Sequence, residues 1–302
     1  MNDRSVAIIV PTLNRRALLS RCLANLASLH GEGILVVVVD NGSSDGTSAM
    51  VRAEHPTVHL IREETNQGVS GGRNAGIRYA RADLQCDLFM FMDDDATLAP
   101  DALAWMRRTL ERDPGIGLVT PKRYVEGHAN LIGSAGGHDV NFYTGVIKNI
   151  GAGEIDRGQF DEERDVRSAG GIALVRAAVF ERIGLYDERF NPYGWEDVDL
   201  SLRARASGFR IRYQPRALAF HAGGKLGRRR ATPAYERSKT KNYIWLVRKH
   251  ATFPQKCALV VVLPVRALAA VVRELLRGNA AAGISILSGG LQALGIGSRR
   301  DK

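Results

Sequence analysis

The chain of 302 residues is 45% hydrophobic and 25% charged, as is usual for a folded globular protein with one large core or two modest ones. Its net charge of +10 is concentrated at one end, because residues 225–302 hold 16 of the 42 Lys and Arg but 3 of the 32 Asp and Glu. A nucleic-acid-binding protein usually spreads its positive charge over a folded face, so we expect no nucleic-acid partner. The three dispersed cysteines exclude a disulfide framework, and no signal-peptide pattern follows Met1, so we expect a cytoplasmic protein.

Strand and helix patterns alternate through the first 120 residues. Four short apolar runs predict strands at Val6–Pro11, Ile34–Asp40, Val58–Ile61 and Asp87–Met92. Helices are predicted over Ala17–Leu29, after the first run, and over Asp101–Arg112, after the fourth. This order predicts an α/β fold in which helices flank both faces of an open, mostly parallel sheet.

The segment Asn66–Gly76, between the third and fourth strands, is rich in glycine and is expected to be a loop that enters a helix. It lacks the G-x-G-x-x-G spacing of a dinucleotide-binding turn, which argues against an NAD site. Its glycines would let the backbone approach a phosphate or ribose, and Arg73 can stack on a base or donate hydrogen bonds to it. A plain turn before a helix explains the same residues equally well.

Patterning weakens between Val125 and Val166, where we expect loops or a hairpin over the site. It returns at Ser168–Arg176 and continues with predicted helices at Ala177–Ile183 and Trp195–Ser207. A closing strand is predicted at Arg210–His221.

Three consecutive aspartates, Asp93, Asp94 and Asp95, follow the fourth apolar run. Adjacent carboxylates repel one another unless a cation or hydrogen bonds compensate their charge. A small hard cation binds one or two carboxylates together with phosphate oxygens, so the cluster predicts a divalent metal site. The position is suitable, because ligands of such sheets bind at the carboxyl ends of the strands. The alternative is a solvated turn before the helix.

A second acidic pair, Glu196 and Asp197, begins a predicted helix about a hundred residues later. Acidic residues are common at helix N-termini because they interact favourably with the helix dipole, so a structural role is the first alternative. If the aspartate cluster holds a metal, however, this pair is free to accept a proton from an attacking hydroxyl. His221, at the end of the closing strand, is chemically suitable as a third metal ligand, although most single histidines are core or surface residues.

In this order, the motifs resemble those of family-2 inverting glycosyltransferases with the GT-A fold, especially the rhamnosyltransferase-like branch. Each segment alone is unspecific, but the ordered set extends from about residue 5 to residue 250. The matching segments are Val6–Asn14, Val38–Thr47, Asn66–Gly76, Met92–Asp95, Gly194–Arg203 and the residues around His221.

The resemblance implies which residues bind the donor. Pro11, Thr12 and Asp40 would contact the nucleobase or nucleoside. Arg73 would contact the base or the diphosphate, and Asp94, with Asp93, would contact the nucleotide sugar.

It also implies a metal site and a mechanism. Asp93 and Asp95 would form the D-x-D motif that binds Mg²⁺ or Mn²⁺ with the donor diphosphate, and His221 would be an additional ligand. Asp197 would be the catalytic base of a single inverting displacement. Trp195 and Glu196 would lie on the acceptor side.

The implied enzyme is a metal-dependent hexosyltransferase. Its donor would be a nucleotide-diphosphate sugar, with dTDP-rhamnose the first candidate. Its acceptor would be a hydroxyl of a glycan or lipid-linked saccharide in cell-envelope polysaccharide synthesis. The alternatives are a nucleotidyltransferase on a similar sheet, which would release pyrophosphate, and a non-catalytic nucleic-acid-binding protein that uses the basic end.

The resemblance places a GT-A catalytic domain at residues 1–224, with a nucleotide-binding half at 1–120 and an acceptor half at 121–224. Residues 225–302 would form a basic, amphipathic helical region. Within it, Arg228–Arg230 can be assigned to a loop that closes over the donor diphosphate.

The segment Cys257–Leu276 is mostly apolar, but its longest uncharged run has nine residues, and about 20 are needed to span a bilayer. Arg266, Arg273 and Arg277 fall on one helical face, and Pro264 is expected to kink or start the helix. The pattern predicts a helix lying on an anionic membrane surface, so that the protein would be peripheral on the inner face of the cell membrane. A buried helix or a homo-oligomer contact through the C-terminal helices is the alternative.

Overall fold

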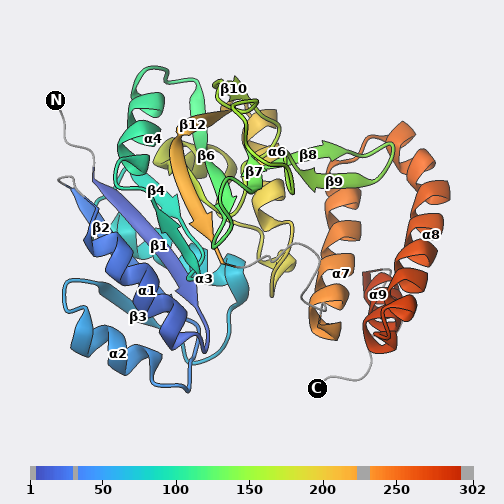
Figure 1. The fold of residues 1–302 in the computed structure, drawn as a ribbon, viewed down its shortest axis with the longest axis horizontal. Helices are drawn as coiled ribbons and strands as arrows, with labels where there is room; N and C mark the ends of the chain where they lie inside the picture. Colours follow the sequence, from blue (N-terminus) through green and yellow to red (C-terminus); the bar gives the residue numbers. More distant parts are fainter. Residues whose placement is uncertain (1–4, 30–32, 223–231, 294–302) are drawn as a thin grey trace.

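The computed structural model describes residues 5–29, 33–222 and 232–293, which form a large mixed sheet with flanking helices and a C-terminal group of helices (Figure 1). The strands of the large sheet are β1 (Val6–Thr12), β2 (Ile34–Asp40), β3 (His59–Arg62), β4 (Leu88–Phe91), β5 (Ala96–Leu98), β6 (Ile116–Val125), β7 (Ile132–Ala135), β10 (Arg164–Asp165), β11 (Ala173–Arg176) and β12 (Arg210–His221). A separate hairpin consists of β8 (His138–Asn141) and β9 (Val146–Asn149).

Helices precede, follow and connect these strands. They are α1 (Arg16–Ala27), α2 (Thr47–Glu54), α3 (Gly68–Ala82), α4 (Ala102–Glu111), α5 (Ala177–Ile183), the 3-10 turn η1 (Glu188–Phe190), α6 (Glu196–Ala206), α7 (Pro233–His250), α8 (Phe253–Leu276) and α9 (Ala280–Ala293).

The main sheet has the strand order β10-β12-β6-β11-β4-β1-β2-β3. Strands β3, β2, β1, β4, β6 and β12 share one direction, and β11 lies antiparallel between β4 and β6. The predicted open, mostly parallel sheet is therefore confirmed. Thr12 is in register with Asp40 at the carboxyl ends of β1 and β2, so both residues lie at the edge where such folds bind ligands.

Apolar side chains of the sheet alternate between two cores, as strand geometry requires. Ile8 and its same-face neighbours pack with α1, α2 and α4, whereas Ile9 packs with α3, α5 and α6. Helix α3 lies very close to β1 at Ile9, because a Cβ atom on Gly76 would be only 2.5 Å from an Ile9 methyl carbon. Glycine at this position therefore lets α3 approach β1 closely.

A helix boundary and a strand differ from the predictions. The expected loop before the helix is short, and the glycine-rich segment is already helical from Gly68, because close packing against the sheet outweighs the low helix propensity of glycine. The region between Val125 and Val166 contains the short strands β7 to β10, with the expected hairpin present as β8–β9, whereas β6 before it was not predicted.

The C-terminal group of helices confirms the predicted helical extension. Figure 1 shows α7 and α8 side by side, with the β8–β9 hairpin reaching their upper ends and α9 at their lower ends. Pro264 lies inside α8 and does not start it, because α8 begins at Phe253 behind a Thr252 capping box. None of the described helices combines the length and apolar content needed to cross a membrane.

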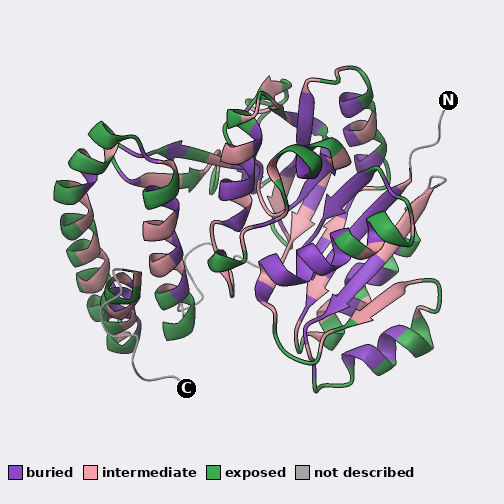
Figure 2. Cartoon of the chain, turned by 180° about the vertical axis from the view of Figure 1, so that it is seen from behind, coloured by how far each residue is buried: buried purple, intermediate pink, exposed green. Residues whose placement is uncertain are grey.

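The C-terminal helices are joined to the rest of the protein through a third apolar core. Four buried side chains from different elements belong to this one core: Phe190, Val198, Leu246 and Leu259. Figure 2, in contrast, shows many exposed residues on the outer sides of α8 and α9. The predicted boundary after residue 224 stays a prediction, and Arg228–Arg230 lie outside the described residues.

Candidate active site

Strand pairing brings three predicted metal ligands together. His221, the last residue of β12, is in register with Ala96 of β5, and the Ala222 amide donates to the Asp95 carbonyl at 3.0 Å. As a result, His221 Nε2 lies 3.2 Å from Asp93 Oδ2 and 3.0 Å from Asp95 Oδ1.

The chemistry of this trio fits a divalent cation. One ligand atom from each of Asp93, Asp95 and His221 can be chosen so that all lie within 4.8 Å of one another, and two carboxylates with an imidazole are a donor set that Mn²⁺ accepts. Burial lowers the His221 pKa, but its bonds to Asp93 and Asp95 outweigh this and raise the pKa to about 9. Without a cation, an imidazolium therefore balances the carboxylates; a bound metal would displace its proton.

Asp94 points away from the trio. It accepts a hydrogen bond from Thr12 Oγ1 at 2.7 Å, and Arg15 bridges Asp94 and Asp95 with two contacts of 2.7 Å. Burial raises the pKa of Asp94 to about 6. In this structure Asp94 connects the end of β4 to β1 through its hydrogen bond with Thr12. Its contact with the nucleotide sugar stays a prediction.

The loops after β1 and β2 hold each other in place, because the Asn14 amide donates to Ser43 Oγ and the Ser44 amide donates to Asn14 Oδ1, each at 2.8 Å. Asp40 is fully buried and accepts hydrogen bonds from the Ser43 amide, from Ser48 Oγ and from Arg62. Because protein groups enclose its carboxylate, direct contact of Asp40 with a base stays a prediction, as does the role of Pro11 beside it.

A cavity of about 1120 Å³ opens next to these loops. Asn14, Arg15, Asp45 and Asp95 are among its lining residues, and Tyr235 of α7 contributes from the other side. Ligand cavities typically measure about 300–1,000 Å³, so the space is large enough for a nucleotide beside the trio.

Arg73 connects the metal trio to the start of α6. Its side chain is 1% exposed, with Nη1 3.1 Å from Glu196 Oε1 and Nη2 3.5 Å from Asp93 Oδ1. The guanidinium also lies over the Tyr186 ring, 5.4 Å from its centroid. In this structure the enclosed guanidinium positions the two acidic groups, and the predicted contact of Arg73 with the base or the diphosphate stays a prediction.

The first turn of α6 places Asp197 close enough to Arg73 and Asp93 for their charges to act on its carboxyl group. Asp197 Oδ1 accepts a hydrogen bond from the Val198 amide at 2.8 Å, while the neighbouring Glu196 is engaged by Arg73 and by the Gly194 amide. Burial raises the pKa of Asp197. A more basic carboxylate is suited to accept a proton, whereas Glu196 is already engaged by the guanidinium of Arg73.

Trp195 caps α6 with a backbone φ of 72°. This left-handed conformation is uncommon for a bulky residue and costs about 1–3 kcal/mol. A hydrogen bond of 3.0 Å from its indole nitrogen to the Lys239 carbonyl holds it in place. Such strain is typical of functional sites; the position of Trp195 on the acceptor side stays a prediction.

His138 of β8 is a site residue that the sequence did not reveal. Its Nδ1 lies 3.9 Å from Asp197 Oδ2, and its ring packs edge-on against Trp195. Burial and the charge of Arg123 lower the His138 pKa to about 4, so the imidazole is neutral at pH 7. Arg123 and His138 were missed because they lie on β6 and β8, which patterning did not predict.

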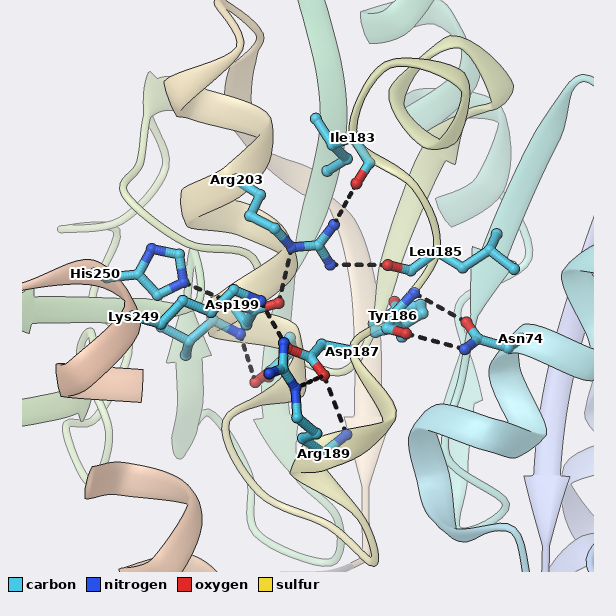
Figure 3. Close-up of polar contacts among 12 residues, drawn as sticks. Asn74, Ile183, Leu185, Tyr186, Asp187, Arg189, Asp199, Arg203, Lys249 and His250 are labelled. Carbon is cyan, nitrogen blue, oxygen red and sulfur yellow. Dashed lines mark hydrogen bonds and ion pairs between the residues drawn. The ribbon is translucent and has the colours of Figure 1, made fainter. Parts of the chain in front are cut away.

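A buried ionic network also fixes the first turn of α6 (Figure 3). Asp199 is fully buried and lies 2.8 Å from Arg203 Nε, 2.8 Å from Lys249 Nζ and 2.7 Å from His250 Nε2. Lys249 and His250 end α7, so Asp199 joins that helix to the helix that carries Asp197.

Residues 7–184 match the model of a protein family described as Glycosyl transferase family 2. The match includes Asp93, Asp94 and Asp95, whereas Asp197 and His221 lie beyond it.

Two curated relatives are glycosyltransferases or glycan synthases. A pre-mycofactocin glycosyltransferase of Mycobacterium tuberculosis is 26% identical over 226 residues, 73% of this chain and 43% of the relative. A poly-beta-1,6-N-acetyl-D-glucosamine synthase of Staphylococcus aureus is 22% identical over 219 residues, 71% of this chain and 49% of the relative. The chain thus spans less than half the length of these relatives.

Among solved structures, the chain is similar to a mannosyltransferase of Pyrobaculum calidifontis in complex with GDP-Man and Mn²⁺. The TM-score is 0.59 at 19% identity, over 97% of this chain and 88% of that chain. At this identity the similarity concerns the fold, and it confirms the predicted GT-A type.

Proposed function

The chain belongs to glycosyl transferase family 2, and on that premise we propose that it transfers a sugar from a nucleoside diphosphate to an acceptor hydroxyl with inversion. The observation that carries the proposal is that two acidic groups from distant parts of the chain lie on either side of one buried arginine. Asp93 and Asp95 lie with His221 on one side, Asp197 lies on the other, and Arg73 bridges the two sides.

The donor side is assigned to the first group. Mn²⁺ or Mg²⁺ would be held by Asp93, Asp95 and His221, and when bound it would stabilise the negative charge that develops on the departing diphosphate. Arg15 would keep the second carboxylate in position from the opposite side. The cavity beside Asn14 and Arg15 would hold the nucleoside.

The acceptor side is assigned to the first turn of α6. Asp197 would accept the proton of the attacking hydroxyl, since burial makes its carboxylate more basic. Neutral His138 beside it would help to orient that hydroxyl. Attack from the face opposite the diphosphate inverts the anomeric carbon in one displacement.

The finer assignments rest on the sequence resemblance. They are a hexose donor, with dTDP-rhamnose as the first candidate, and a glycan or lipid-linked acceptor in cell-envelope polysaccharide synthesis. The exposed apolar side chains of α8 and α9 and the basic C-terminal region support peripheral attachment to an anionic membrane. An oligomer contact through the same helices is the alternative explanation of that surface.

Calorimetric titration with a panel of nucleoside diphosphates, with and without Mn²⁺, tests the donor assignment. One base should bind in a metal-dependent manner, and the matching sugar nucleotide should then release its nucleoside diphosphate. Release of pyrophosphate instead would favour a nucleotidyltransferase. RNA binding at physiological salt without nucleotide binding would favour the nucleic-acid alternative.

A further inference from the structure

We infer that the groove between α7, α8 and α9 binds the hydrocarbon chain of a lipid-phosphate acceptor and delivers its head to the catalytic cleft. The inference rests on the proposed function, since it names the acceptor class of that same site. The groove has a volume of about 1010 Å³, at the upper end of the range of ligand cavities.

The walls of the groove are apolar side chains from four elements. The β8–β9 hairpin contributes Ile147, α7 contributes Val247, α8 contributes Leu263 and Ala267, and α9 contributes Ile286. A peptide in such a groove would bury backbone groups without partners, which is costly. A hydrocarbon chain has no polar groups to satisfy, so it is the occupant that this lining favours.

The charges along the groove are all of one sign. Its lining, among the described residues, includes Lys239, Lys256, Arg266 and Arg273 and no carboxylate. Lys256 and Arg266 form no ion pair with any residue that the structure describes, whereas Arg273 is paired with Glu274. This set of cations complements a phosphate or diphosphate at the end of the chain.

Trp195 connects the groove with the proposed catalytic residues. The indole ring lines the groove, packs edge-on against Tyr243 in the groove wall with centroids 6.1 Å apart, and also packs edge-on against His138, which lies near Asp197. Lys239 Nζ lies over the same indole, 5.1 Å from its centroid. A phosphate at Lys239 would therefore place an attached sugar towards Asp197.

The wall on the α7 side is rigidly fastened to the catalytic elements. Asn242 is fully buried and donates to the carbonyls of Phe190 and Tyr193, while Ser238 also donates to Tyr193. With the Asp199 network of Figure 3 at the other end of α7, these bonds fix the distance between groove and cleft.

The opposite wall, α8, has a second apolar face that points outwards. The side chains on it are spaced four, three, four and three residues apart and are 45% to 70% exposed: Val261, Val265, Leu268, Val272 and Leu275. Such a stripe suits contact with a bilayer. A lipid chain leaving the bilayer would then have only one helix to pass before it reaches the groove.

Calorimetry with farnesyl phosphate, an isoprenoid phosphate, tests the inference on the full chain. The matched variants are Ala267→Trp, which fills the groove, and Ala269→Trp, an exposed residue of the same helix that does not line it. We expect Ala267→Trp to bind farnesyl phosphate at least about tenfold more weakly than wild type, and Ala269→Trp to bind it equally well. Arg266→Glu should reduce the affinity for farnesyl phosphate more than the affinity for farnesol, which has no phosphate.

Equal affinity of the two tryptophan variants, or no binding by wild type, would overturn the inference. Loss of binding in Ala269→Trp alone would also overturn it and indicate adsorption on the outer stripe. If Ala267→Trp does not fold, Leu287→Trp fills the groove from α9, where Leu287 is 52% exposed. Metal-dependent nucleotide binding, measured on the same samples, should be unchanged in every variant; its absence from wild type would count against the proposed function and not against the groove.

Discussion

The catalytic cleft and the C-terminal helices depart from the usual distribution of side chains in opposite ways. In the cleft, charged groups are buried: Arg73 is 1% exposed and Asp95 4% exposed, and each is paired with a group of opposite charge. On the C-terminal helices, large apolar groups are exposed, with Phe253 at 79% and Leu276 at 84%. Both arrangements oppose stability of the isolated chain.

The contrast indicates what each region lacks without its ligands. Buried ionisable groups with perturbed pKa values cluster at functional sites, and large exposed apolar patches mark surfaces that meet a partner or a membrane. Under the proposed function, the first region would bind a cation and a phosphate, and the second would bind an apolar partner. The following predictions test the two halves of this comparison, starting with the largest effect.

Removal of the metal should have the largest effect. Chelation should abolish sugar transfer, and Mn²⁺ or Mg²⁺ should restore it, because the diphosphate leaving group needs a Lewis acid. The measurement is release of nucleoside diphosphate before and after addition of each cation. Full activity in excess chelator would show that the trio is only an ion-pair network.

Replacement of the base should leave the donor side intact. Asp197→Asn keeps the shape of the side chain but cannot accept a proton, so turnover should fall about 10²–10⁴-fold while the KM for the donor changes little. Asp83→Asn, at an exposed position, is the control. Near-normal turnover of Asp197→Asn would assign proton acceptance to another group.

Disruption of the buried network should affect stability. Asp199→Asn leaves Arg203 and Lys249 without their shared carboxylate, and breaking a buried pair of this kind costs about 3 kcal/mol in the free energy of unfolding. Urea unfolding of the wild type and the variant measures this difference. If the free energy of unfolding of the variant equals that of wild type within experimental error, apolar contacts alone hold α7 to α6.

The pH dependence of that difference follows from the pKa of Asp199. Burial raises this pKa, but the bond to His250 and the charge of Arg203 outweigh burial and lower it below its usual range. A carboxyl group whose pKa is lower in the folded than in the unfolded state stabilises the fold fully above about pH 4, the pKa of an unfolded aspartate. This stabilisation is lost as the pH falls through the pKa of the group in the folded protein. The difference between wild type and Asp199→Asn should therefore shrink on acidification below about pH 4; a constant difference would contradict this.

Substitution on the outer stripe of α8 should have the smallest effect on the fold. Val265→Glu changes a residue that is 65% exposed, so the free energy of unfolding should change by no more than about 0.5 kcal/mol. The same change should reduce co-sedimentation with anionic liposomes, and high salt should reduce that of wild type. Unchanged sedimentation would leave the oligomer contact as the explanation of the stripe.

Elements that appear as continuous apolar patterns in the sequence were predicted correctly. Strands such as Ile34–Asp40 are buried on both faces and appear as uninterrupted apolar runs. The strands from β7 to β10 are two to four residues long and depend on distant partners, so no local pattern marks them. The helical state of Gly68–Gly76 follows from packing against Ile9, which outweighs propensity.

The candidate site was predicted only in part, for the same reason. The acidic residues and His221 follow or end predicted elements, and the resemblance assigned roles to them. The partners of these residues could not be predicted. Arg15, Arg123 and His138 reach the cleft only through loop packing and strand register, and the enclosure of Arg73 depends on residues about a hundred positions away.

The most direct test of the central claim separates the two acidic groups by their ligands. Mn²⁺-dependent binding of the preferred nucleoside diphosphate should be measured by calorimetry for wild type, Asp95→Ala and Asp197→Asn. The account predicts that Asp95→Ala loses metal-dependent binding whereas Asp197→Asn retains wild-type affinity. Equal affinity for all three proteins, or loss of binding in Asp197→Asn alone, would contradict it.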